Sequence, residues 1–146
     1  MKVYLDSCCI QRTLDSRTQV RIVLEAEAVL GILALVEAGE LEMVSSDALV
    51  FESDRIPNPT RQEYALEVLS RASTFVVLSD GVEERARGLS AAGLRPLDAL
   101  HLAFAEDAQA THFCTCDDRL LVRARAVAKP WTRVVPPIEL IGELEA

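Results

Sequence analysis

Four acidic residues occupy positions near which the chain passes from one predicted structural element to the next: Asp6, Glu52, Asp98 and Asp117. Carboxylates crowded into one pocket repel one another, and burial adds a desolvation cost, so such groups take up protons or share a cation. Oxygen ligands favour Mg²⁺ or Mn²⁺ over Zn²⁺. The two histidines and four cysteines are poorly spaced for a zinc site. We therefore predict a Mg²⁺ or Mn²⁺ site built from the four acids.

The chemistry of such a site follows from the charge of the cation. A bound divalent ion inverts the local charge, so an acidic pocket becomes a site for phosphate. The ion polarises a phosphoryl oxygen and lowers the pKa of a bound water, which permits phosphodiester hydrolysis without a side-chain nucleophile. Ser7 and Thr115 stand close to the first and last acids, and their hydroxyls are candidates for orienting an acid or the attacking water. Helix caps or strand-end hydroxyls are an equally good interpretation of both.

The segment that carries Asp98 has the most distinctive pattern. Pro96 is favoured in the first turn of a helix, where its missing amide donor would be unpaired anyway. Nearly every residue from 97 to 108 is apolar, so we expect this helix to be buried on most sides. An acid in its first turn also complements the helix dipole without any function. His101 lies one turn after Asp98, and we interpret it as a core residue bonded to a backbone carbonyl rather than as a metal ligand.

Apolar runs and helical spacing alternate along the chain. We predict strands at residues 2–5, 41–45, 74–78, 111–115 and 133–135. We predict helices at residues 20–37, 47–55, 60–72, 82–92 and 96–109, another that begins at 117–118, and one or two turns after 136–137. The polar residues 11–19 are expected to form a loop with at most one helical turn. This order indicates a single α/β domain over residues 1–146, with a parallel sheet of four to five strands flanked by helices.

The parallel order predicts where the acids meet. Asp6 and Asp117 each follow a predicted strand, and the carboxyl ends of parallel strands share the edge at which ligands bind. Asp6 and Asp117 should therefore lie together despite their distance in the sequence. Glu52 and Asp98 are expected to reach the same edge on topological grounds alone.

The chain has a net charge of -8. This charge disfavours nucleic-acid binding by bulk electrostatics, since phosphate contacts require local Lys or Arg. It leaves room for a nucleic-acid enzyme with a small basic rim, and for a basic protein partner. Candidates for the rim are Arg12, Arg17, Arg21, Arg55 and Arg95. We take Arg12 and Arg95 as candidate substrate-binding residues, although a solvated helix face is the commoner explanation for any one arginine.

The four cysteines occur as the adjacent pair Cys8-Cys9 and the alternate pair Cys114 and Cys116. We interpret them as small, reduced, half-buried side chains of a cytosolic protein. Neither pair has the two-residue gap that is typical of a thiolate metal site. A disulfide between the two pairs stays open only if their strands are neighbours.

The sequence contains no stretch close to the ~20 apolar residues that a membrane-spanning helix needs. Residues 1–4 run directly into a strand pattern rather than a signal peptide. We therefore expect a cytoplasmic protein with no membrane contact.

Four segments resemble the motifs of the PIN-domain ribonucleases, which include the VapC-type toxins of bacterial toxin-antitoxin systems. The segments are Val3-Tyr4-Leu5-Asp6-Ser7, Ser45-Ser46 followed by Glu52, Pro96-Leu97-Asp98-Ala99-Leu100-His101-Leu102-Ala103, and Thr115-Cys116-Asp117. Each segment is short, but together they cover essentially the whole chain in the order of the family. Cys8-Cys9 departs from the small residue and hydrophobic residue that many members carry there.

The resemblance implies a PIN-like parallel sheet with flanking helices, dependence on Mg²⁺ or Mn²⁺, and endonucleolytic cleavage of RNA. It implies that the catalytic, metal-binding acids are Asp6, Glu52, Asp98 and Asp117, with Asp118 as the substitute if the fourth motif shifts by one residue. It also implies an antitoxin protein as a partner and pairing of two copies into a homodimer.

Two functions from different classes fit these observations. The first is a metal-dependent endoribonuclease, the toxin of a toxin-antitoxin pair. The second is a catalytically silent PIN-like module that binds a protein or RNA. The two differ in their need for a cation, because a silent module would bind its partner equally well in EDTA.

Overall fold

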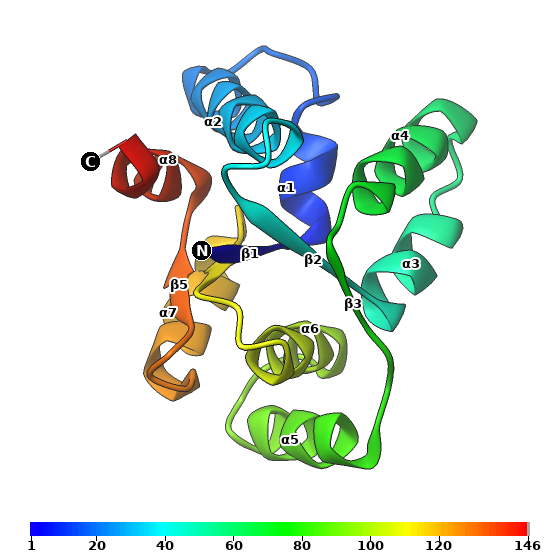
Figure 1. Ribbon diagram of the computed structural model, residues 1–146, viewed down its shortest axis with the longest axis vertical. Coiled ribbons are helices and arrows are strands. Elements are labelled where there is room, and N and C mark those ends of the chain that lie inside the picture. The colour runs from blue at the N-terminus through cyan, green and yellow to red at the C-terminus, as the bar shows by residue number, and fades with distance from the viewer. Residues whose placement is uncertain (146) are drawn as a thin grey trace.

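The computed structural model describes residues 1–145, and a five-stranded parallel sheet forms its centre (Figure 1). The strands are β1 (Lys2–Leu5), β2 (Glu42–Ser46), β3 (Thr74–Val76), β4 (His112–Cys114) and β5 (Arg133–Val135). Their order across the sheet is β3-β2-β1-β4-β5, and every neighbouring pair is parallel. The predicted α/β fold is confirmed, with five strands from the expected four to five.

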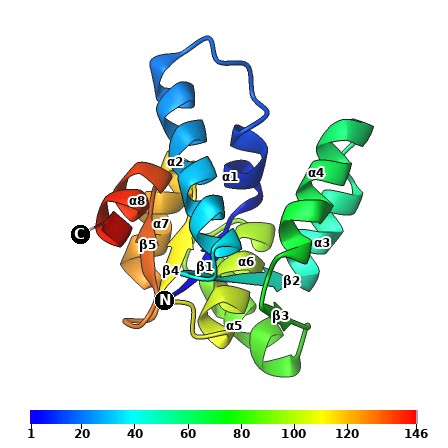
Figure 2. The ribbon, with the colours of Figure 1, turned by 45° about the horizontal axis from the view of Figure 1, so that its top comes forward.

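Eight helices flank the sheet within residues 1–145. They are α1 (Ser7–Arg12), α2 (Val20–Glu37), α3 (Asp47–Asp54), α4 (Pro59–Ser70), α5 (Asp80–Ala91), α6 (Pro96–Asp107), α7 (Asp118–Val127) and α8 (Pro137–Glu145). Helices α1 and α2 lie on one side of the sheet and α5 and α6 on the other, as Figures 1 and 2 show. Buried parallel strands need such cover on both faces. None of these helices combines the length and apolar character needed to cross a membrane.

The central strand β1 explains why Asp6 lies where it does. Tyr4 is paired with Val44 of β2 on one side and with Phe113 of β4 on the other. The rings of Tyr4 and Phe113 stack with their centroids 5.5 Å apart. Immediately after β1, the amide of Asp6 donates to the carbonyl of Cys114 at 2.9 Å. The carboxyl ends of β1 and β4 therefore meet at one edge of the sheet, and Asp6 lies at that edge.

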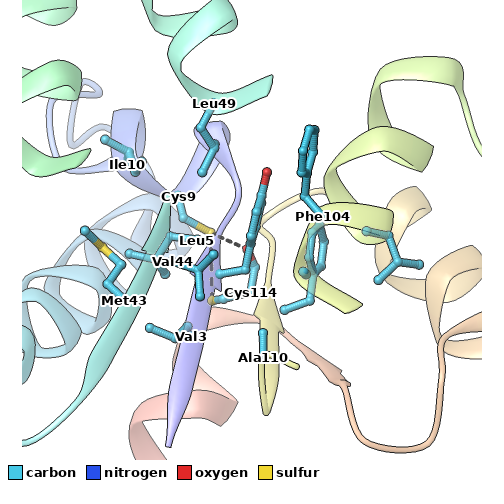
Figure 3. Packing of buried hydrophobic residues seen from close by; sticks show 14 of the residues in the cluster. Val3, Leu5, Cys9, Ile10, Met43, Val44, Leu49, Phe104, Ala110 and Cys114 are labelled. Atoms are coloured by element: carbon cyan, nitrogen blue, oxygen red, sulfur yellow. Dashed lines mark hydrogen bonds between the residues drawn. The ribbon is translucent and has the colours of Figure 1, made fainter. Parts of the chain in front are cut away.

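Helix α6 is buried along most of its length, as its apolar sequence predicts. Leu102, Phe104 and Ala105 are each at most 1% exposed. Figure 3 shows buried side chains from α1, the central strands and α6 packed together. Leu97, at the start of α6, is an exception and keeps 37% of its surface exposed. This core holds the first turn of α6, and with it Asp98, against the sheet.

Helix α1 was not predicted, and residues 7–12 are all helical. The prediction that residues 11 and 12 belong to a loop was wrong. The carboxylate of Asp6 caps this helix, and Cys9 and Ile10 are buried beneath it. A helix of six residues is too short to show a helical period in the sequence, so only the cap could have revealed it.

The C-terminal helix α8 is also longer than the one or two turns expected. It packs along α2, and Leu140 is fully buried. Gly31 of α2 permits the close approach, because a Cβ atom there would lie 3.2 Å from Cδ1 of Ile141. The helix continues through Glu145, and Ala146 lies outside the described residues.

Candidate active site

Asp6 lies at the carboxyl end of β1 and is only 7% exposed. Its Oδ1 accepts a hydrogen bond from the amide of Ser7 at 2.8 Å. Its Oδ2 accepts from the hydroxyl of Thr115 at 2.9 Å and from the thiol of Cys8 at 3.2 Å. Donors from α1 and from the segment after β4 thus fix the orientation of this carboxyl group.

The pKa of Asp6 is raised to about 8, chiefly by burial and also by Cys8, although the charge of His101 acts to lower it. The physical cause is desolvation, which disfavours the ionised form of a carboxyl group. A nearby cation would restore the carboxylate, because it supplies the charge that water supplies at the surface. A bound cation would therefore stabilise the ionised form of Asp6.

Glu52 lies on α3, and a chain of hydrogen bonds connects its side chain to α6 and to the central strand β1. Its Oε1 is bonded to Nε2 of His101. Nδ1 of His101 lies 2.6 Å from the hydroxyl of Tyr4, which in turn lies 2.7 Å from Oγ of Ser46. The amide of Leu49 donates to the same Ser46 oxygen at 3.2 Å. The position of Glu52 is thus tied to α6 and β1.

His101 belongs to this site, and the prediction that it bonds a backbone carbonyl was wrong. Both of its ring nitrogens bond side chains instead. Burial lowers the pKa of His101, but the hydrogen bond to Glu52 and the charge of Asp6 outweigh burial and leave the pKa raised. Asp6, Glu52 and His101 offer ligand atoms that lie within 4.8 Å of one another. The sequence signal for His101 was its place one turn after Asp98.

Asp98 is half-buried in the first turn of α6. Burial raises its pKa, and the charges of Asp6 and Asp117 raise it further. Carboxylates influence one another in this way only when they are close. Residues that are far apart in the sequence thus form one acidic group at the carboxyl edge of the sheet.

Asp117, rather than Asp118, is the fourth member of this group. Its Oδ1 accepts from the amide of Arg119 at 3.0 Å and so caps α7, and its own amide donates to Oγ1 of Thr115 at 3.1 Å. Asp118 instead pairs with Arg21 at 2.7 and 2.8 Å, and its side chain is 71% exposed. Of the two candidates for the fourth motif, Asp117 is therefore the acid that lies near Asp6 and Asp98.

A family model of the PIN domain matches residues 3–126, which is most of the chain. The chain belongs to the PIN-domain family. PIN domains are generally nucleases that act on nucleic acids. No curated protein sequence gave a match.

Two crystal structures share the fold of this PIN domain. PAE2754 from Pyrobaculum aerophilum has a TM-score of 0.60 and 17% identity, and the match covers 99% of this chain and 90% of that one. VapBC2 from Rickettsia felis, bound to a DNA fragment from their promoter, has a TM-score of 0.57 and 13% identity, and the match covers 93% of this chain and 98% of that one. At these identities the likeness establishes the fold alone.

Arginines near the acids of this PIN domain differ in how strongly they are engaged. Arg12 lies 3.0 Å from Asp15 and 3.3 Å from Glu25. Arg95 is exposed just before α6, where its charge lowers the pKa of Asp98. Within residues 1–145 no ion pair engages Arg95. The other three arginines of the predicted rim are also engaged. Arg17 pairs with Glu27, Arg21 pairs with Asp118, and Arg55 lies over the ring of Phe51.

A cluster of thiols lies beside Asp6. The sulfur of Cys9 is 3.6 Å from that of Cys116 and 3.9 Å from that of Cys114. All four cysteines are free, and Cys8, Cys9 and Cys116 lie within 4.8 Å of one another. Hydrogen bonds from Cys8 and Cys9 lower the pKa of Cys116 to about 5. Sequence spacing could not reveal this cluster, because its members come from two segments that meet only in the folded sheet.

The donor set of the acidic group fits a hard divalent cation. Four carboxylates supply oxygen ligands, which Mg²⁺ and Mn²⁺ prefer. Burial raises the pKa values of Asp6 and Asp98, and the charges of Asp6 and Asp117 raise that of Asp98 further. A cation would offset the desolvation and the repulsion. Both ring nitrogens of His101 form hydrogen bonds, one with Glu52 and one with Tyr4. They therefore orient the Glu52 carboxylate and are not counted among the ligands of the ion. The residues that would hold the cation are Asp6, Glu52, Asp98 and Asp117.

Proposed function

We propose that this PIN domain is a Mg²⁺- or Mn²⁺-dependent endoribonuclease that hydrolyses phosphodiester bonds of RNA. One observation carries the proposal. Asp6, with its pKa raised to about 8, shares one sheet edge with three further acids. Such a group is costly to bury without a cation, and the family in which it occurs consists generally of nucleases.

In this proposal the four acids would hold the cation, which when bound would supply Lewis acidity toward a phosphoryl oxygen and toward a water. Thr115 fixes the carboxyl group of Asp6, and His101 fixes that of Glu52. Arg95 and Ser7, near Asp98 and Asp6 respectively, contact the phosphates of the substrate. Arg12, which is engaged by Asp15 and Glu25, orients α1 rather than the RNA.

The proposal includes a role as the toxin of a toxin-antitoxin pair. The structure of VapBC2, which shares the fold, carries that pairing in its name. The net charge of -8 favours a basic protein partner over an acidic one. We also propose that two copies associate as a homodimer, which light scattering on the purified chain would test.

The test uses a pool of single-stranded RNA of random sequence, with cleavage followed on a gel in Mn²⁺ and in EDTA. We expect cleavage in Mn²⁺, none in EDTA, and recovery when Mn²⁺ is restored. Asp98→Asn should lose at least ~100-fold in rate, whereas Asp118→Asn, a matched control at an exposed acid, should cleave like wild type. RNA binding that is equal in Mn²⁺ and EDTA, with no cleavage in either, would favour the silent binding module.

A further inference from the structure

The proposed reaction uses none of the four cysteines, yet their sulfurs gather directly beside it. Cys8 and Cys9 lie on α1, and Cys114 and Cys116 lie at and just beyond the end of β4 (Cys9 and Cys114 are labelled in Figure 3). The sulfur of Cys9 lies 3.6 Å from that of Cys116. At this distance the two sulfurs are close enough to react with one another after a small movement.

The geometry selects one pair of cysteines. Cys8 and Cys9 are adjacent, so their Cα atoms are ~3.8 Å apart, which is shorter than the ~4.4–6.8 Å of ordinary disulfides. Cys9 and Cys114 are both fully buried, with no access for an oxidant. Cys116 keeps 6% of its surface exposed and lies next to the half-buried Asp117. Cys8 is half-buried, but its thiol already donates to Asp6 at 3.2 Å. We therefore take Cys116 as the first sulfur to be oxidised, with the sulfur of Cys9 as its partner at 3.6 Å.

We propose that a hydroperoxide oxidises Cys116, that Cys9 then closes a Cys9–Cys116 disulfide, and that this disulfide weakens the adjoining cation site. The weakening of the cation site rests on the proposed function, whereas the formation of the disulfide does not.

The reaction balances with hydrogen peroxide as the only co-reactant. The sulfur of Cys116 attacks one peroxide oxygen and the O–O bond breaks. The thiol proton leaves with the departing hydroxide as water, and a sulfenic acid remains. The sulfur of Cys9 then attacks that of Cys116, an S–S bond forms and the S–O bond breaks. The second hydroxide leaves with the proton of Cys9 as water. Two thiols lose two electrons, and one peroxide is reduced to two waters.

The disulfide would act on the acids through the backbone around Cys116. The two sulfurs must move from 3.6 Å to a bonded distance of ~2.05 Å. Cys116 stands between Thr115, whose hydroxyl bonds Asp6, and Asp117. The amide of Cys116 also donates to the sulfur of Cys8 at 3.3 Å, and the Cys8 thiol donates to Asp6. A shift of Cys116 therefore disturbs two acids and the donors that orient one of them.

The test treats the full chain with hydrogen peroxide, then determines its intact mass, maps its peptides and measures Mn²⁺ binding by calorimetry. We expect the loss of two hydrogen atoms in mass, a cross-link between the peptides of Cys9 and Cys116, and a cation affinity about tenfold lower. Dithiothreitol should restore the affinity. Cys9→Ala should resist both changes, and Cys114→Ala, the matched control in the same cluster, should show both. Thermal unfolding establishes that each variant is folded.

Three results would overturn the proposal. They are a wild-type chain that gains only oxygen, a cross-link that persists in Cys9→Ala, and a cross-linked chain with unchanged Mn²⁺ affinity. A metal ion held by the thiols of the untreated protein, detected by elemental analysis, would also overturn it in favour of a thiolate metal site. If the untreated, reduced protein binds no Mn²⁺ but still forms the disulfide after peroxide treatment, the proposed nuclease would be overturned and only the disulfide chemistry would be supported.

Discussion

The hydroxyl of Tyr4 lies 2.6 Å from Nδ1 of His101 and joins the central strand to helix α6 inside the molecule. Nε2 of the same ring bonds the carboxylate of Glu52, which can only accept. In its neutral form the ring therefore carries its proton on Nε2, and Nδ1 accepts from Tyr4. Ser46 completes the chain at 2.7 Å from the Tyr4 hydroxyl. The orientation of a candidate metal ligand thus depends on a buried tyrosine that has no chemistry of its own.

Replacing Tyr4 with Phe removes the hydroxyl that pairs His101 with Ser46. We expect the free energy of unfolding to fall by ~1–3 kcal/mol, because two buried polar groups lose a partner. Mn²⁺ affinity should fall about tenfold, since His101 no longer holds Glu52 as firmly. Urea denaturation and calorimetry measure these changes. Tyr64→Phe is the matched control, because the Tyr64 hydroxyl bonds only Thr13 at 2.8 Å. Equal loss of Mn²⁺ affinity in the two variants would contradict the account.

Asp6 gives the cation-free protein a distinctive pH dependence of stability. The pKa of its carboxyl group is about 8 in the folded state, against ~3.9 in an unfolded chain. The folded state binds the additional proton between these values, so the stabilisation is complete below about pH 4 and is lost as the pH rises to about 8. We expect a loss of a few kcal/mol, and at most ~6.

Urea denaturation in EDTA, between about pH 5 and pH 8, measures this dependence. Asp6→Asn should keep the cap of α1, because Asn is as good a cap as Asp, and its stability should vary less with pH than that of the wild type. Identical pH dependence in both proteins would show that Asp6 is not the group responsible.

Thr115 supplies the only hydroxyl that donates to Asp6 among residues 1–145, at 2.9 Å. Thr115→Val keeps the shape of the side chain and removes the donor, so the carboxylate of Asp6 is less stable. Mn²⁺ affinity should fall ~10-fold or more. Thr132→Val is the matched control, since its buried hydroxyl bonds only the carbonyl of Ala110 at 2.7 Å. An unchanged affinity in Thr115→Val would remove the proposed positioning role.

Much of the fold was predictable because its signals are local. The short apolar runs and the Pro96 start of α6 each depend on a few neighbouring residues, and they led to the correct order of the strands and of every helix except α1. Helix α8 was predicted too short, because its last turn is stabilised by contacts with α2, in which Ile141 lies over Gly31. No pattern near residue 137 carries that information.

Helix α8 therefore offers a test of the packing. Leu140 is fully buried, whereas Ile138 on the same helix is 47% exposed. Leu140→Ala should lower the free energy of unfolding by ~2–5 kcal/mol because it leaves a cavity, and Ile138→Ala should cost under ~1 kcal/mol. Denaturant titration of both variants decides the matter. Equal, small losses would mean that α8 contributes little to the core.

The candidate site was predictable only in part, for a related reason. The meeting of Asp6 with Asp117 follows from parallel strand order, which the sequence indicates. The hydrogen bonds of His101 depend on the crossing of α6 over β1, and the approach of Cys9 to Cys116 depends on the pairing of β1 with β4. These contacts are long-range, so spacing along the chain could not distinguish them from ordinary core packing.

The most direct test of the central claim is calorimetric titration of Mn²⁺ into the wild type, Asp6→Asn, Asp98→Asn and Asp118→Asn. We expect wild type and Asp118→Asn to bind alike, because Asp118 pairs with Arg21 at the surface. Asp6→Asn and Asp98→Asn should lose binding while remaining folded. No binding by the wild type, or binding that survives both substitutions, would contradict the claim that these acids form a cation site.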